Sequence, residues 1–199
     1  MRAKLERGVA CITTSLLLTS CSMFGGNSAD DALKALQWSY AANAITLQLD
    51  ASADLNQHDG APHTVSLAVV QTADASTFAQ LTDSPEALAQ LLSNDSTPDQ
   101  ALDVQRLFVA PSAQSQIKLA RAAGARFVGV VAGFYQLDPK NSTRSYAIAT
   151  VVHSTGWLAK HRTAEPAPLT IALHLGRAAI LNLPVPVTAA SGTPTAGSS

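Results

Sequence analysis

Cysteine is scarce in this chain, which has only Cys11 and Cys21 among 199 residues. Both lie near the N-terminus, so the sequence after Cys21 has no thiol for a disulfide, a nucleophile or a metal ligand. A domain without cross-links must be held together by its hydrophobic core.

Catalytic sequence motifs are also missing. There is no Gly-x-Ser-x-Gly elbow, no His-Glu-x-x-His and no glycine-rich phosphate loop between a strand and a helix. His58, Asp59 and His63 share one turn-rich segment that could in principle hold a metal ion, but a solvated polar loop is the simpler interpretation. We therefore expect no enzyme activity, no cofactor and no small-molecule substrate.

Long apolar runs are absent as well. Residues 9–18 form an apolar run of about ten residues, no other stretch reaches 18, and a spanning helix needs about 20. Arg2, Lys4 and Arg7 precede this run, and Leu18-Thr19-Ser20-Cys21 closes it. That order is typical of a secretory signal. Its end resembles a bacterial lipobox, which implies cleavage before Cys21 and a lipid on the Cys21 thiol. The alternative is an ordinary secretory signal that happens to contain a cysteine.

The residues around the cleavage point also predict location and charge. Ser22 follows the cysteine, where an Asp would retain a lipoprotein at the inner membrane, so we expect an outer-membrane protein facing the periplasm. Residues 1–20 hold three bases and one acid, and their removal leaves ten basic and 13 acidic residues. This acidic balance argues against nucleic acid as a partner.

The chain divides into four predicted parts: a signal peptide over 1–20, a lipidated tether over 21–44, one domain over 45–187, and a disordered tail over 188–199. The tail contains only small and polar residues and proline. Within the tether, Asp30 or Asp31 could cap a short helix carrying Leu33, Leu36 and Tyr40.

Alternation of apolar and polar residues dominates the domain and predicts an all-β fold. Short strands separated by turn residues favour a two-sheet β-sandwich, with strands over 45–49, 65–69, 103–110, 117–119, 127–135, 146–152, 169–175 and 178–183. The segment 127–135 is almost wholly apolar, which suits a central strand. His174 should face away from Ile171, Leu173 and Leu175, and 160–162 reads as a basic connecting loop.

Residues 76–94 break this rhythm with a helical period. Ser84 is a credible N-cap, Pro85 occupies the first helical position, and Leu88, Leu91 and Leu92 share one face. We therefore predict a small helical insertion between the second and third strands.

The order of these features resembles a known family. The lipobox, the short tether, the strand and polar loop ending in Gly60-Ala61-Pro62, the helical insertion and the strand Phe127-Val128-Gly129-Val130-Val131 together resemble the type VI secretion lipoprotein TssJ (VasD/SciN). Ser112 departs from the pattern, since relatives often carry Gly after the proline. The resemblance implies a transthyretin-like sandwich that binds the periplasmic C-terminal region of the inner-membrane protein TssM.

The resemblance also implies which residues bind the partner. In the family, the loop between the first two strands takes part in TssM binding, and here that loop comprises Asp54, Leu55, Asn56, Gln57, His58, Asp59, Gly60, Ala61, Pro62 and His63. Loops on a rigid scaffold often carry recognition. The alternative function is another periplasm-facing outer-membrane lipoprotein, such as a secretin pilot or a carrier of a small apolar ligand.

Overall fold

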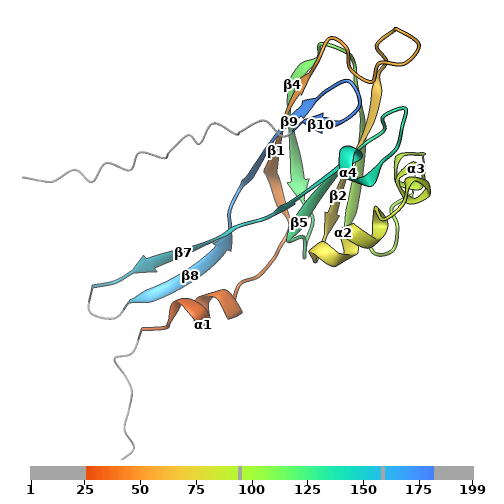
Figure 1. Ribbon diagram of the computed structural model, residues 1–199. Helices are drawn as coiled ribbons and strands as arrows, with labels where there is room; N and C mark the ends of the chain where they lie inside the picture. The colour runs from red at the N-terminus through yellow and green to blue at the C-terminus, as the bar shows by residue number, and fades with distance from the viewer. Residues whose placement is uncertain (1–25, 94–95, 158–159, 182–199) are drawn as a thin grey trace, which may run out of the picture.

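Two four-stranded sheets face each other in the computed structural model, which describes residues 26–93, 96–157 and 160–181 (Figure 1). The first sheet has the strand order β10 (Ile180–Leu181), β9 (Leu169–Leu175), β1 (Ala41–Ala51) and β4 (Gln114–Arg121). The second has the order β3 (Asp103–Val109), β2 (Val65–Thr72), β5 (Phe127–Ala132) and β6 (Thr143–Ala147). The predicted two-sheet sandwich is confirmed.

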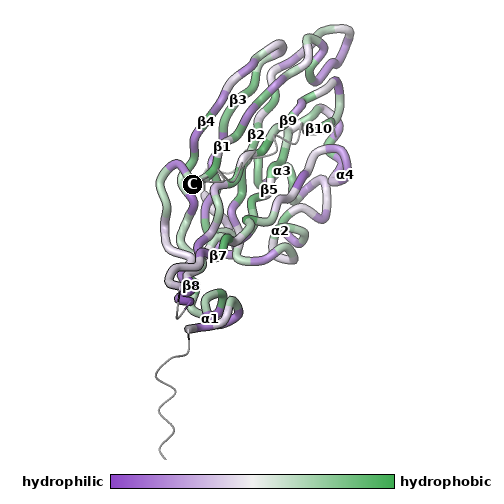
Figure 2. Tube along the Cα trace, turned by 90° about the vertical axis from the view of Figure 1, so that its left-hand side faces the viewer, coloured by the Kyte–Doolittle hydropathy of each residue, from purple (hydrophilic) through white to green (hydrophobic). Residues whose placement is uncertain are grey.

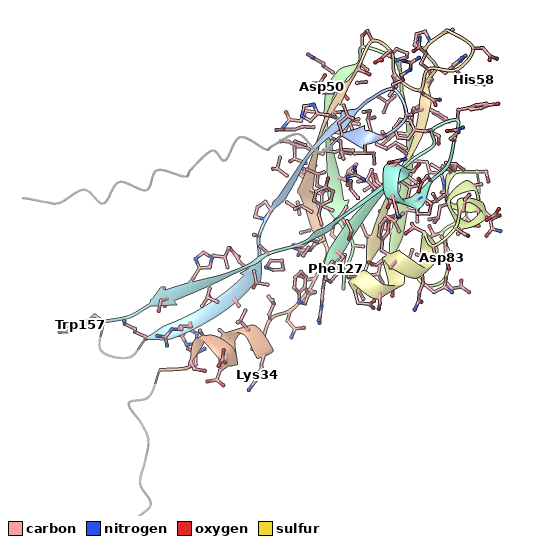
Figure 3. All side chains as sticks on the ribbon, in the orientation of Figure 1. Lys34, Asp50, His58, Asp83, Phe127 and Trp157 are labelled. Atoms are coloured by element: carbon pink, nitrogen blue, oxygen red, sulfur yellow. The ribbon has the colours of Figure 1, made fainter. Side chains whose placement is uncertain are left out.

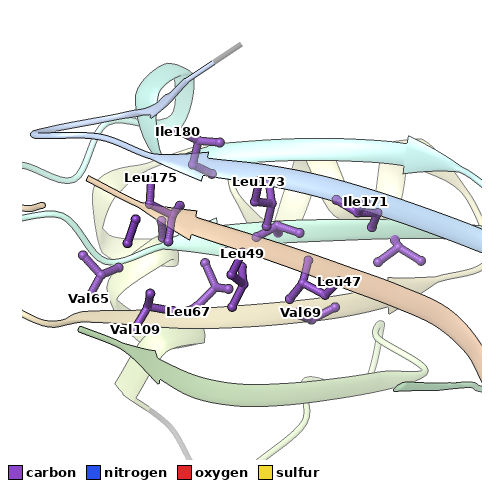
Figure 4. Packing of buried hydrophobic residues seen from close by; sticks show 14 of the residues in the cluster. Leu47, Leu49, Val65, Leu67, Val69, Val109, Ile171, Leu173, Leu175 and Ile180 are labelled. Carbon is purple, nitrogen blue, oxygen red and sulfur yellow. The ribbon is translucent and has the colours of Figure 1, made fainter. Parts of the chain in front are cut away.

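The core lies between the sheets, where alternate residues of each strand point inward (Figure 4). Leu47 and Leu49 of β1 meet Leu67 and Val69 of β2, and all four side chains are buried. Val130 of β5 is fully buried in the same cluster. The alternation seen in the sequence therefore marks the inner face of each sheet.

Strand pairing in the first sheet is mixed. β1 pairs antiparallel with β4 and parallel with β9, with Leu47 opposite Ile117 on one side and Ile171 on the other. His174 of β9 points out of the core, as predicted, and its Nδ1 lies 3.1 Å from the Asp50 carboxylate of β1.

The helical insertion covers the outer face of the second sheet. It consists of α2 (Ala75–Leu81) and α3 (Pro85–Ser93), whose Phe78, Leu88 and Leu91 pack on Ala68, Val70 and Val131. Ser84 is the predicted N-cap of α3, because its Oγ accepts a hydrogen bond from the Ala87 N–H at 3.2 Å. With both faces covered, β2 and β5 are buried except for the half-buried Ser66 and Phe127, which explains the nearly continuous apolar sequence of β5.

A separate two-stranded ribbon, β7 (Thr150–Thr155) and β8 (His161–Pro166), projects away from the sandwich (Figure 1). This corrects two predictions. The single strand over 146–152 is interrupted at Ile148, whose side chain joins the core while its N–H donates to the Arg126 carbonyl. The predicted connecting loop over 160–162 runs into β8, because His161 and Arg162 pair with Thr155 and Ser154.

Further strand boundaries also differ from the predicted ones, and among them β4 is longer than the predicted strand over 117–119. The strand over 127–135 ends at Ala132, and the last strand is confined to Ile180–Leu181 within the described residues. β1 begins at Ala41, earlier than predicted. A short helix, α4 (Pro139–Ser142), lies between β5 and β6.

The N-terminal helix, α1 (Ala29–Lys34), lies under the ribbon rather than along a free tether. Its N-cap is Ser28, not Asp30 or Asp31, and Ser28 and Asp31 form a reciprocal capping box. Figure 2 shows this helix and the ribbon below the sheets. The predicted signal, the lipidation site Cys21 and the tail over 188–199 lie outside the described residues. Within the described part of the chain, no helix is long and apolar enough to cross a membrane.

Candidate functional site

The loop over 54–63 joins β1 to β2 at the end of the sandwich far from α1 and the ribbon (Figure 3). Backbone hydrogen bonds fasten its first half to the turn between β9 and β10. The Asn56 N–H donates to the Gly176 carbonyl at 3.4 Å, and the Gln57 N–H donates to the Arg177 carbonyl at 3.1 Å. The loop is therefore supported by a neighbouring segment that is distant in sequence.

Leu55 and Asn56 belong to the fold rather than to the loop's surface. Leu55 is completely buried, and Asn56 is 9% exposed. Asn56 has a φ of +49°, a conformation that Asn tolerates better than most residues. Its Oδ1 accepts a hydrogen bond of 2.7 Å from the Tyr135 N–H. These two residues of the predicted partner site hold the loop in place, so the structure leaves them little surface for a partner.

The tip of the loop is a tight turn. His58 and Ala61 exchange two backbone hydrogen bonds of 3.0 Å each, and the residues between them, Asp59 and Gly60, have φ values of +50° and +77°. Two positive φ values are typical of a type I′ turn, which suits Asp-Gly. The tip and the residues after it, Ala61 to His63, are exposed.

An aromatic contact extends this surface beyond the loop. The His58 ring stacks on the Tyr135 ring, with centroids 3.4 Å apart and planes 17° from parallel. Tyr135 follows β5 and is 65% exposed. A hollow of about 300 Å³ lies beside the pair, lined by polar and small residues that include Gln57, Gln136 and Arg177. The combination of a rigid turn, an exposed aromatic ring and polar side chains is suited to recognising a protein surface.

The histidines of the loop do not assemble a metal site with Asp59. A ring nitrogen of His63 lies 3.3 Å from the His58 carbonyl oxygen, and His58 is 3.2 Å from the exposed Asp59 carboxylate. No group of three or more His, Cys, Asp or Glu side chains in the described residues could hold a metal ion.

Sequence reasoning missed the contribution of Tyr135, Gln136 and Arg177 to this surface. Tyr135 was assigned to the strand over 127–135, and Arg177 was placed between two strands without a role. Tyr135 and Arg177 lie in segments that the packing of the sheets brings next to the loop. The sequence alone therefore does not indicate that they contribute to this surface.

The described residues thus form a two-sheet β-sandwich with a helical insertion and a tightly ordered loop at one end. The family model for type VI secretion lipoproteins, described as VasD, EvfM, TssJ and VC_A0113, matches residues 43–175. The chain belongs to this family, whose members are structural lipoproteins and not enzymes. It is thus a membrane-bound component of a type VI secretion system, and the family's place is the outer membrane.

Solved structures agree on the fold. One similar chain comes from a structure described as the C-terminal domain of the type VI secretion protein TssM from EAEC. Its TM-score to this protein is 0.52 and its sequence identity 16%. The match covers 71% of this chain and 98% of that chain. The Serratia marcescens protein Lip, described as a membrane-bound component of the type VI secretion system, has a TM-score of 0.51 and 18% identity. It covers 73% of this chain and 98% of its own. No curated protein matches the chain by sequence.

Proposed function

We propose that this lipoprotein binds the periplasmic C-terminal region of a TssM-like inner-membrane protein and links it to the outer membrane. Lipid on Cys21 holds the chain in the outer membrane, and residues 57–63 with Tyr135 form the contact surface. The observation that carries the proposal is the rigid, exposed tip of the loop, at the end of the sandwich remote from α1 and the ribbon (Figure 3).

Preorganisation of the loop is the physical reason to choose this surface. Association costs less free energy when the contact residues are already ordered, because less conformational freedom is lost on binding. The type I′ turn, the His58–Tyr135 stack and the Asn56 hydrogen bond all order the loop before any partner arrives. The hollow beside the loop is lined mainly by polar side chains, so this surface does not suit the alternative of a carrier for an apolar ligand.

Titration calorimetry with the partner's periplasmic C-terminal region tests the proposal. The protein used is the chain from Ser22 onward, which lacks the signal and the lipid. The combined variant Gln57→Ser, His58→Ser and Asp59→Gly removes the polar side chains of the tip but spares the buried Leu55 and Asn56. We expect affinity to fall at least about tenfold, which corresponds to about 1.4 kcal/mol, with little change in the melting temperature.

The matched control changes exposed polar residues of the helical insertion, on the side of the sandwich. Gln80→Ser with Asp83→Ser alters the helical insertion, where Asp83 lies far from His58 (Figure 3). This variant should bind like the wild type. Unchanged affinity in a folded loop variant would contradict the loop assignment, whereas no binding by the wild-type chain would contradict the partner.

A further inference from the structure

The ribbon of β7 and β8 ends in the most exposed aromatic side chain among the described residues. Trp157 follows β7 and is 89% exposed. Figure 3 shows it at the far end of the ribbon, remote from His58. Val151 and Val152 of β7 are also exposed, by 41% and 36%. A tryptophan held out on a projecting ribbon contributes nothing to the core and is available for a contact outside this chain.

The N-terminal segment is fastened close to the same tip. Asn27 makes three hydrogen bonds to Arg162 of β8. Its Nδ2 donates to the Arg162 carbonyl at 2.7 Å, its Oδ1 accepts from the Arg162 N–H at 2.6 Å, and its own carbonyl accepts from Nη1 at 2.7 Å. Ala32 of α1 is buried against the ribbon side of the molecule, and α1 packs mainly on β8. Ribbon, α1 and Asn27 therefore form one unit.

Chain length then limits how far the tip can be from the membrane anchor. Asn27 follows Cys21 by six positions, which span at most about 20 Å when fully extended. Arg162 pairs with Ser154, and Trp157 lies three residues beyond Ser154, a distance of about 10 Å along a strand. A lipid on Cys21 would thus hold Trp157 within reach of the bilayer surface.

We propose that the tip of the ribbon rests on the membrane that holds the Cys21 lipid, with the Trp157 ring in the bilayer interface. Lys160, exposed on the other side of the tip, lies near the headgroup phosphates. The inference rests on the proposed lipidation of Cys21. It adds a second point of contact, which sets the direction in which the sandwich leaves the membrane.

The chemistry of the tip suits a phospholipid surface. Tryptophan concentrates at membrane–water interfaces, because its ring has both an apolar body and a polar N–H. A lysine near an anionic surface is attracted to it. One ring and one ammonium group would bind lipid weakly on their own, but the tether raises their effective concentration at the surface. Asp30 and Asp31 at the start of α1 oppose this attraction, so Trp157 carries most of the contact.

Fluorescence of Trp157 on vesicles tests the contact directly. Cys21 is the sole thiol of the chain after residue 20, so the chain from Cys21 onward can be coupled to a maleimide phospholipid in vesicles of phosphatidylethanolamine and phosphatidylglycerol. In a Trp38→Phe background Trp157 is the only tryptophan. We expect its emission to move to shorter wavelength on coupling and to be quenched by dibrominated lipid. Lys160→Glu should reduce this quenching, and Lys118→Glu on β4 should not.

The matched control carries Trp157→Phe and retains Trp38. The Trp38 ring is half-buried, with the Arg121 and Arg126 guanidinium carbons 5.8 Å and 5.5 Å from its centroid, and should remain unquenched. If Trp38→Phe perturbs folding, the difference between wild type and Trp157→Phe gives the same signal.

Unshifted and unquenched Trp157 emission in the coupled chain would overturn the proposal. So would a spectral shift that grows with protein concentration without vesicles, because that would indicate a second copy of the chain as the occupant. Chemical coupling replaces lipidation in the cell, so this outcome is independent of whether Cys21 is acylated there.

Discussion

Asn56 shows how a single residue of the predicted partner loop serves the fold instead. Its φ of +49° and its hydrogen bond to the Tyr135 N–H join the loop to the segment after β5. Ser112, outside this loop, is another non-glycine residue with a left-handed backbone: it has a φ of +61° directly after Pro111. That left-handed conformation explains why a glycine would suit the turn, and this chain accepts the strain of a serine there.

Replacing Asn56 tests the structural role. Asn56→Ala leaves the Tyr135 N–H without its partner and puts an alanine at positive φ. We expect a loss of about 1–3 kcal/mol in the free energy of unfolding, from the lost hydrogen bond together with the strain of an alanine at positive φ. Thermal or urea unfolding followed by circular dichroism measures it.

Asn56→Asp keeps an acceptor at the same place and should lose less stability, while the exposed Asn141→Ala should unfold like the wild type. A melting curve of Asn56→Ala that overlays the wild-type curve would show that the hydrogen bond contributes nothing.

The contact between β5 and α2 decides how the helical insertion sits on the sheet. Gly129 of β5 faces the Phe78 ring so closely that a β-carbon there would lie 2.0 Å from Cε2 of the ring. Phe78 is itself buried, so its ring cannot move into solvent without opening the second cluster. This contact explains why a glycine stands at this position of the buried strand.

Gly129→Ala should therefore displace α2 and destabilise the protein by about 1–3 kcal/mol, the usual cost of overpacking. Phe78→Leu shortens the opposing side chain, and the double variant should recover part of the loss. A double-mutant cycle from urea unfolding measures that coupling. Strictly additive effects would show that the two residues do not compete for space.

Elements were predictable where burial imposed a period on the sequence. The inward residues of β1, β2 and β9 alternate cleanly, and the helical insertion shows a helical spacing of leucines. The ribbon was not predicted because all six residues of β7 are exposed. Without a buried face, the strand has no alternation of apolar and polar residues that would indicate it. Ile148 concealed the break between β6 and β7, because it continues the apolar alternation while turning into the core.

The whole molecule has two ends with different chemistry. The loop over 54–63 lies at one end, and the ribbon and α1, close to the chain's N-terminus, lie at the other (Figures 1 and 3). The proposed link between two membranes would use this separation, because the anchor and the partner would then be approached from opposite sides.

Cys21→Ser tests the anchor at this scale. Without a thiol to acylate, the chain should remain soluble in the periplasm or keep its signal peptide, and fractionation with immunoblotting measures both. The fold should survive, because the described core contains no residue before Ala32. Recovery of the variant in the outer membrane at the wild-type level would refute lipidation at Cys21.

The sequence by itself determined the two-sheet sandwich, the helical insertion and the family, because burial leaves a periodic pattern of apolar residues along each strand and helix. It also placed the candidate partner loop. Only the tertiary structure decided which loop residues are available for contact, and that Tyr135 stacks on His58. It alone revealed that the N-terminal segment is fastened to a projecting ribbon. The reason is that these features depend on contacts between segments far apart in the chain, such as Asn27 with Arg162, and such contacts impose no local period.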